Sequence, residues 1–215
     1  MKKLILFIAI VMVGVVMVFL YNTEHKESGE EITSPTVSVS VTVTPSHSPN
    51  LPVGDSIYDP VRVTKKPFGI YVSPDNSPVQ PEKFTGYHTG VDFETTASES
   101  NIDVPVSAFC DGKLLLKEYA TGYGGVAVQS CTLNNQAVTI IYGHLYLASI
   151  KLNNGDRVKK GDPIGNLGKG YSVQTDGERK HLHLGIHKGT TVDIRGYVQQ
   201  QSQLLDWLNP TQFLK

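Results

Sequence analysis

Beyond Ile57 the chain is built from short apolar runs that alternate with turn sequences. The runs VAVQS, AVTIIY and HLHLGIH are rich in Val, Ile and Tyr, and the turn sequences DGK, NNQ, NNGD and GKG separate them. Runs of this length and composition predict β-strands, and short turns between them predict antiparallel neighbours. The sequence therefore predicts a mainly β domain built on an antiparallel β-sheet, which we place at residues 56–215.

One segment of this domain has a helical pattern instead. Within QSQLLDWL, residues 201–208, the side chains of Leu204, Leu205 and Leu208 recur at helical spacing. The following Asn209 and Pro210 are typical of a helix end. The sequence thus predicts a short C-terminal helix.

The N-terminus predicts a membrane anchor. Met1, Lys2 and Lys3 precede residues 4–21, an uncharged apolar run of 18 residues. As a helix this run is about 27 Å long, which is close to the hydrocarbon thickness of a bilayer. A cleaved signal peptide is the alternative, but no A-x-A-like site follows the run. We therefore expect residues 1–21 to form a signal-anchor helix of a single-pass cell-membrane protein, with the rest of the chain on the extracytoplasmic side.

Residues 22–55 predict a linker. The segment is rich in Ser, Thr, Pro and Glu and has no cluster of large apolar residues that could start a core. Its stretch VSVSVTVT alternates as a strand does, but only Ser and Thr lie on the opposite face and prolines flank it. An extended tether fits this composition.

Charge argues against one class of partner. Nineteen basic and twenty acidic residues give a formal net charge of -1, and the sequence has no basic stripe. Binding to a nucleic acid backbone is therefore not expected.

The two cysteines, Cys110 and Cys131, lie in the part of the chain expected outside the cytoplasm. Each is close to a predicted strand, and neighbouring strands would bring them together. We expect a disulfide, which would contribute about 3 kcal/mol in the chain-entropy model. Two free buried thiols are the alternative, since sequence does not give the Cα separation.

Three histidines occur in RKHLHLGIHKG, residues 179–189. In a strand, His181 and His183 share one face, while Leu182 and Leu184 point to the other. Such a pair is either a solvated polar face or part of a metal site. His187 follows beyond Gly185, and we interpret it as a surface histidine.

Further candidate ligands occur in GYHTGVDFE, residues 86–94, where Asp92 follows His88 by four positions. These two share a face in a strand or a helix, although alone they are as consistent with a simple hydrogen-bonded pair. Catalytic zinc takes three protein ligands from His and carboxylate groups and leaves one position for water. His88, Asp92 and one histidine of HLH satisfy this count. The segment IIYGHLY adds His144.

Together these motifs resemble the LytM and lysostaphin-type zinc metallopeptidases, which cut peptide bonds of bacterial peptidoglycan. The likeness covers nearly all of residues 67–213. In chain order it runs through FG, HTGVDF, VPVSAFCDGKLL, YGGVAVQS, YGHL, NNGDRVKKGDPIGNLGKG, HLHLGIH and NPTQFL. The stretch SVQTDGERK before HLH is longer and more polar than the resemblance leads us to expect, and the cysteine pair is an addition.

The resemblance implies a zinc site and a catalytic pair. Its HxxxD motif falls on His88 and Asp92 as Zn²⁺ ligands, and the second histidine of its HxH motif falls on His183 as the third ligand. Its catalytic pair falls on His144 and His181. It also implies a zinc endopeptidase acting on stem or bridge peptides of peptidoglycan, and leaves open which peptide bond is cleaved and which histidine is the base.

Two alternative functions remain. One is a catalytically inactive module of the same fold that binds the cell wall or regulates another hydrolase. The other is a carrier domain, since NNGDRVKKGDPIGNLGKG is similar to the turn sequence of lipoyl and biotinyl carriers, with Lys169 as acceptor. Lys169 lies between two glycines rather than in the sequence expected of an acceptor, which argues against the carrier.

Overall fold

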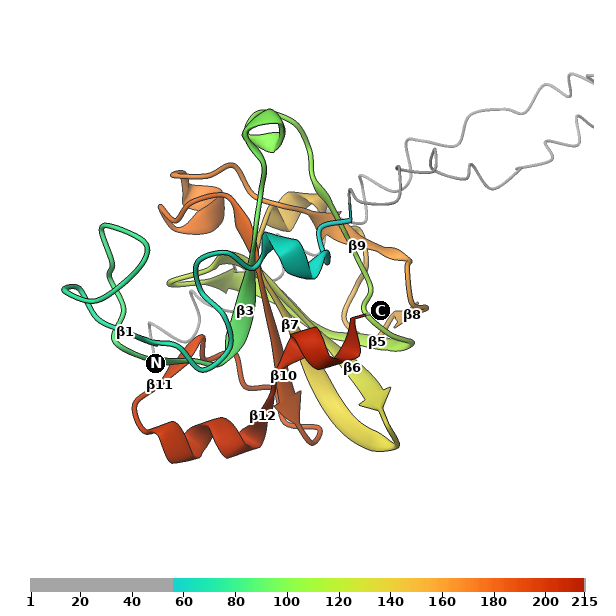
Figure 1. The fold of residues 1–215 in the computed structure, drawn as a ribbon. Helices are drawn as coiled ribbons and strands as arrows, with labels where there is room; N and C mark the ends of the chain where they lie inside the picture. The colour runs from blue at the N-terminus through green and yellow to red at the C-terminus, as the bar shows by residue number, and fades with distance from the viewer. Residues whose placement is uncertain (1–55, 215) are drawn as a thin grey trace, which may run out of the picture. The chain divides into compact units, whose positions relative to one another are not determined.

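The computed structural model describes residues 56–214 and confirms a mainly β domain with antiparallel pairing (Figure 1). Its strands are β1 (Tyr71–Val72), β2 (Gly86–His88), β3 (Gly90–Glu94), β4 (Pro105–Ser107), β5 (Gly112–Ala120), β6 (Gly124–Leu133), β7 (Gln136–Leu145), β8 (Arg157–Val158), β9 (Pro163–Asn166), β10 (His181–Lys188), β11 (Tyr197–Val198) and β12 (Trp207–Leu208). Short 3-10 helices connect them: η1 (Pro60–Arg62), η2 (Ala97–Glu99), η3 (Leu147–Ser149), η4 (Val173–Thr175), η5 (Gln201–Asp206) and η6 (Pro210–Phe213).

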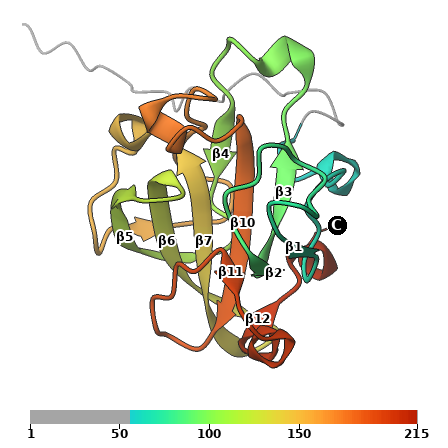
Figure 2. The ribbon, with the colours of Figure 1, turned by 90° about the vertical axis from the view of Figure 1, so that its left-hand side faces the viewer.

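The main sheet has the strand order β12-β10-β7-β6-β5-β8, and β3 also pairs with β10. Strand β10 is therefore flanked by β7 on one side and by β3 and β12 on the other, as Figure 2 shows. Two smaller sheets, β1-β2-β11 and β4-β9, complete the described part of the chain. Because β10 pairs with strands on both sides, its two faces decide where the core and the polar side chains lie.

The sequence alternation of β10 matches these two faces. Leu182, Leu184 and Ile186 are fully buried in the larger hydrophobic cluster, together with Val91 and Phe93 of β3. The histidines point to the opposite face, because successive side chains of a strand alternate. The apolar face fixes the register of β10, since a shift by one residue would place the leucines on the polar side.

The β6–β7 hairpin shows how the local sequence sets the register of the strand next to β10. Its two-residue turn is Asn134-Asn135, with φ of 49° and 63°. Asparagine tolerates this left-handed conformation, and two such residues twist the hairpin in the sense that the strands require. The hairpin extends to Leu145, so that His144 lies at the end of β7.

The predicted disulfide joins Cys110 to Cys131, with a Cα separation of 6.0 Å. Both cysteines are buried in the larger hydrophobic cluster. The described cysteines contain no free thiol.

The prediction of a C-terminal helix over residues 201–208 is only partly right. The helical segment η5 is a 3-10 helix that ends at Asp206, and Leu205 is exposed. Trp207 and Leu208 instead form β12 and pair with His187 and Ile186 of β10. Pairing with β10 buries the indole of Trp207 to 3% exposure, which a continued helix would not provide.

The predicted anchor at residues 1–21 and the predicted linker at 22–55 lie outside the described residues. Within residues 56–214, no helix has the length and apolarity needed to cross a bilayer. The domain boundary near residue 56 and the membrane anchor therefore stay predictions.

Candidate metal centre

Three strands bring together the three predicted metal ligands. His88 ends β2, Asp92 is the central residue of β3, and His183 lies in β10 directly opposite Asp92 in the antiparallel register. Only Thr89 separates β2 from β3. Backbone pairing therefore places all three side chains, and their exposed fractions are 0%, 2% and 3%.

The ligand atoms converge on one point. His88 Nε2 lies 3.0 Å from His183 Nδ1, and Asp92 Oδ1 lies 3.2 Å from each of these nitrogens. Ligand atoms 2.0–2.2 Å from a tetrahedral zinc lie about 3.3 Å apart, so this triangle has the size that zinc requires. The donor set of two imidazoles and one carboxylate also suits zinc.

Hydrogen bonding prepares His88 for such a role. Its Nδ1 lies 3.2 Å from the carbonyl oxygen of Pro67, to which an N–H can donate. The proton is then on Nδ1, and the lone pair of Nε2 points toward Asp92 and His183. Metal-binding histidines are commonly oriented by this kind of contact.

The charge states of the triad also suit a cation. Burial lowers the pKa of His183 to about 4, although its hydrogen bond with Asp92 opposes this shift. Burial alone would raise the pKa of Asp92, but the neighbouring imidazoles of His181, His88 and His183 hold this pKa well below its usual range. At neutral pH the site therefore offers a neutral imidazole and an ionised carboxylate, the forms that bind metals.

The two predicted catalytic histidines lie beside this triangle. The ring centroids of His144 and His181 are 4.2 Å apart, and the side chain of each is almost fully buried. His181 Nε2 lies 3.2 Å from Asp92 Oδ2, while its Nδ1 lies 2.9 Å from the carbonyl oxygen of Arg179. Burial, reinforced by charge on His181, lowers the pKa of His144 well below its usual value, and His144 Nδ1 has no hydrogen-bond partner. His144 is thus a neutral imidazole with an available nitrogen.

Two further residues considered in the sequence, His187 and Lys169, lie away from the metal triangle. His187 is not a surface residue as predicted, because its side chain is only 13% exposed and packs against Trp207. Lys169 lies in the loop that follows β9. Neither residue lines the cavity at the metal triangle.

A cavity of about 360 Å³ gives access to the triangle and to both catalytic candidates. Tyr123 Oη is buried at this cavity without a hydrogen-bond partner, and its ring centroid is 5.3 Å from that of His183. The cavity is lined by Lys66, Phe84, Thr85, Asp92, Thr121, Gly122, Tyr123, His144, Glu178, Arg179, His181, His183, Ile194, Arg195, Gly196, Tyr197 and Gln199.

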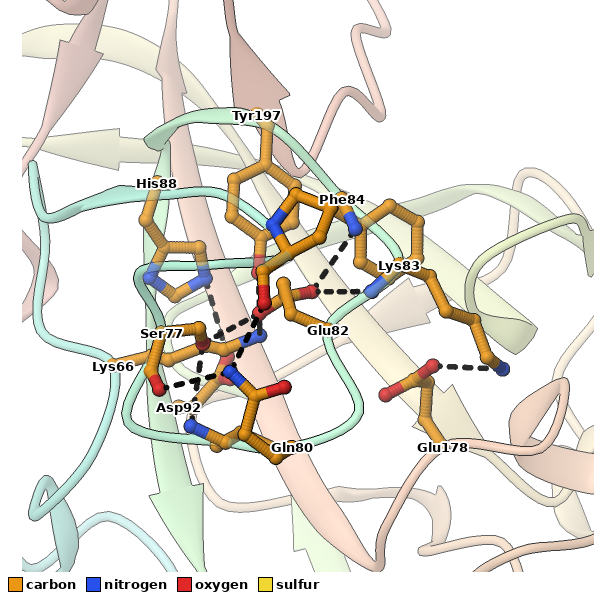
Figure 3. A network of polar contacts seen from close by, with 12 residues as sticks. Lys66, Ser77, Gln80, Glu82, Lys83, Phe84, His88, Asp92, Glu178 and Tyr197 are labelled. Atoms are coloured by element: carbon orange, nitrogen blue, oxygen red, sulfur yellow. Dashed lines mark hydrogen bonds and ion pairs between the residues drawn. The ribbon is translucent and has the colours of Figure 1, made fainter.

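One wall of the cavity comes from the β1–β2 loop, residues 73–85, which Glu82 organises (Figure 3). One carboxylate oxygen of Glu82 lies 2.6 Å from Lys66 Nζ and accepts a hydrogen bond from Ser77, and the other accepts the backbone N–H groups of Lys83 and Phe84. Lys66 Nζ also donates to Tyr197 Oη at 2.9 Å. The ring of Tyr197 lies between those of Phe84 and His88.

The same loop reaches across to the segment that precedes β10. Lys83 Nζ lies 3.0 Å from a carboxylate oxygen of Glu178 and donates to the carbonyl oxygen of Asp176. Asp176 in turn accepts hydrogen bonds from Tyr119 Oη and Gly122 N. Three segments that are far apart in the sequence are thereby connected around the cavity.

Sequence reasoning did not identify Lys66, Glu82, Tyr123, Arg179 and Tyr197 at this site. For Arg179 there was one indication, the unexpected polar stretch SVQTDGERK before HLH. The lysine pair at 65–66 and the isolated Tyr197 carry no local pattern that points to a cavity.

Comparison with known proteins identifies a family. A family model described as peptidase family M23 matches residues 86–194, just over half of the chain. The match includes His88, Asp92, His144, His181 and His183. No match was found among curated proteins.

Several solved structures are similar to parts of the chain. LytU is 25% identical, with a TM-score of 0.48 over 71% of this chain and 83% of its own. Lysostaphin, solved by NMR, is 29% identical, with a TM-score of 0.39 over 50% of this chain and 39% of its own. LytM from Ruminococcus gnavus ATCC 29149 is 26% identical, with a TM-score of 0.40 over 58% and 45%. This chain thus spans less than half of the lysostaphin and LytM chains.

Proposed function

Because this chain belongs to peptidase family M23, we propose that its described domain is a zinc-dependent endopeptidase that hydrolyses peptide cross-links of bacterial peptidoglycan. One observation carries the proposal: His88 Nε2, Asp92 Oδ1 and His183 Nδ1 form a metal-sized triangle beside the His144–His181 pair, at a cavity. Zinc held there would supply Lewis acidity, which activates water and polarises a peptide carbonyl.

The two histidines beside the triangle have different surroundings, which suits them to different tasks. His144 is neutral and has a nitrogen without a partner, so it can accept a proton. His181 faces a carbonyl oxygen with Nδ1 and a carboxylate oxygen with Nε2, so it is placed to donate N–H groups. In peptide hydrolysis such a donor stabilises negative charge on the carbonyl oxygen or protonates the leaving amine.

The cavity beside the triangle offers groups that can orient a peptide substrate. Its lining includes the rings of Phe84 and Tyr123 and the charged groups of Glu178 and Arg195. Aromatic walls with a few polar groups are typical of sites that orient a ligand by shape and by selected hydrogen bonds.

We also propose that the domain lies outside the cytoplasm and is attached to the membrane by an anchor helix at residues 4–21. The apolar run and its preceding lysines support this, as does the Cys110–Cys131 disulfide, because such bonds persist in oxidising compartments. Fractionation of cells that express the full chain tests the anchor. Full chain in the membrane pellet after a salt wash is the expected result, and full chain in the soluble fraction would contradict it.

Hydrolysis is tested on purified cell walls of different cross-link chemistry, with released fragments identified by mass spectrometry. We expect cleavage of a peptide bond in the cross-links, loss of cleavage with a chelator and recovery when Zn²⁺ is added. A protein that binds zinc and the wall but releases no fragment from any wall would contradict the enzyme and favour a binding or regulatory module.

A further inference from the structure

The side chain of Arg179 lies against the oxygen of Asp92 that faces away from the metal triangle. Arg179 immediately precedes the HLH segment, and its Nη2 donates to Asp92 Oδ2 at 2.8 Å. Both side chains are nearly buried, with exposed fractions of 7% and 3%. The two oxygens of Asp92 are therefore in different surroundings, one facing His88 and His183 and the other facing Arg179 and His181.

Glu94 holds the guanidinium in this position. Arg179 Nε lies 3.0 Å from each carboxylate oxygen of Glu94, and Nη2 also donates to one of them. In the pairing of β3 with β10, Glu94 lies opposite His181 and Asp92 lies opposite His183, so both acidic side chains share the face of the histidines. A forked pair of this kind restrains the orientation of the guanidinium.

The charges of this cluster are balanced. A lone arginine beside a divalent cation would weaken metal binding by repulsion. Here the carboxylate of Glu94 compensates the guanidinium, and Lys65 approaches Glu94 only at 3.5 Å from the exposed side. Burial alone would lower the pKa of Arg179, but Asp92 and Glu94 raise it above the usual value, so it stays charged.

We propose that Arg179 is a positioning residue that occupies Asp92 Oδ2, so that Asp92 binds the metal through Oδ1 alone, and that Glu94 orients Arg179. This inference rests on the proposed function, since it takes Asp92 as a metal ligand. Partners of metal ligands commonly contribute about 10- to 100-fold in metal affinity. Without Arg179, Asp92 Oδ2 keeps only its contact with His181, and the carboxylate can rotate to bring this oxygen into the coordination sphere.

The experiment compares the full chain with Arg179→Gln, Arg179→Lys and Glu94→Gln, using Zn²⁺ affinity from chelator competition and the visible spectrum of the Co²⁺-loaded proteins. The backbone carbonyl that accepts from His181 is kept in both Arg179 variants. For Arg179→Gln we expect zinc affinity to fall about 10- to 100-fold and the Co²⁺ absorption to weaken, because five-coordinate Co²⁺ absorbs less strongly than tetrahedral Co²⁺. Arg179→Lys should restore part of the affinity, and Glu94→Gln should shift both readouts in the same direction by less.

Arg62→Gln is the matched control, because Arg62 forms a similar part-buried pair with Glu99, at 2.7 Å, and also donates to Glu94, at its backbone carbonyl oxygen. It should alter the melting temperature but neither the affinity nor the spectrum. A wild-type zinc affinity and Co²⁺ spectrum in Arg179→Gln would overturn the inference. If Arg179→Gln does not fold, a wild-type affinity and spectrum in Glu94→Gln would overturn it instead. Loss of hydrolysis plays no part in these readouts. A zinc-loaded wild type that cleaves no peptide therefore contradicts the proposed function while the positioning role is still decided by the metal measurements.

Discussion

The ammonium group of Lys66 lies 2.6 Å from the carboxylate of Glu82, and neither side chain is more than 2% exposed. Glu82 also accepts two backbone N–H groups of the β1–β2 loop, so this ion pair connects the loop to the strand that carries His88 through Tyr197. Removing one partner of a buried ion pair leaves the other charge buried without compensation, which destabilises the folded state.

Glu82→Gln should therefore destabilise the domain by about 3–5 kcal/mol, measured by urea unfolding. The double variant Lys66→Met/Glu82→Gln should recover much of this loss, because it removes both charges while the glutamine oxygen still accepts the loop N–H groups. A double variant as unstable as the sum of the two single variants would contradict the role of the ion pair.

The same carboxylate predicts a pH dependence. Burial alone would raise the pKa of Glu82, but Lys66, Ser77 and the N–H of Phe84 lower it below the ordinary value. As pH falls, Glu82 is therefore protonated in the unfolded chain before it is protonated in the folded one. The stability that its lowered pKa contributes is complete above the unfolded pKa of about 4.3 and is lost as pH falls through the folded pKa. The stability difference between wild type and Glu82→Gln should be constant above about pH 5 and shrink below about pH 4. A difference that stays constant down to pH 3 would be the contrary result.

His183 and His181 should respond differently to substitution, although they share one face of β10. His183→Ala leaves two ligands, so it should lose both zinc and hydrolysis. His181→Ala keeps all three ligands and should retain about one zinc per chain, with turnover reduced about 10²- to 10⁴-fold. His144→Ala should behave like His181→Ala. Elemental analysis and peptide hydrolysis on the same preparations measure both properties.

His187→Ala is the matched control for this series, because His187 lies on the same strand next to Trp207. It should keep zinc and activity. A metal-free His181→Ala beside a loaded His183→Ala would reverse the assignment of ligand and catalytic residue.

Gly90 should tolerate no side chain. A Cβ added there would lie 2.3 Å from the carbonyl oxygen of Leu184 and 2.9 Å from two ring atoms of His183. We expect Gly90→Ala to destabilise the domain by at least about 1–3 kcal/mol, as overpacking does, and to weaken zinc binding by displacing His183. Gly185→Ala is the control, since its Cβ would come no closer than 3.4 Å to Trp207, the nearest side chain. Equal melting temperatures and zinc affinities in the two variants would contradict this expectation.

The sequence led to the central residues of the candidate site because their spacing follows strand geometry. The alternation of HLH places His181 and His183 on one face, and the HxxxD spacing brings His88 and Asp92 into reach of each other. The structure brings all of them together, while their roles as ligands and catalytic groups stay predictions. The short apolar runs and the turn residues between them likewise predicted the antiparallel sheet, because both are local features of the sequence.

The surrounding residues could not be predicted in the same way. Lys66 and Glu82 are sixteen positions apart, and their contact depends on the path of a loop rather than on a periodic pattern. Arg179 precedes β10 and reaches Asp92 through a long side chain that contacts Glu94 of β3. The end of η5 was misjudged for a related reason: the leucine spacing was helical, but pairing of Trp207 with β10 determined the backbone there.

The placement of the site on β2, β3, β7 and β10 also has a consequence for motion. The strands β3, β7 and β10, which carry Asp92 and three of the histidines, pair with one another in the main sheet. Amide hydrogens in such ladders exchange with solvent only through the rarest, most extensive openings of a domain. The candidate metal centre should thus lie in the slowest-exchanging part of the protein. Rearrangements that admit a cell-wall peptide would then be confined to the loops that border the cavity, where amide exchange should be fast.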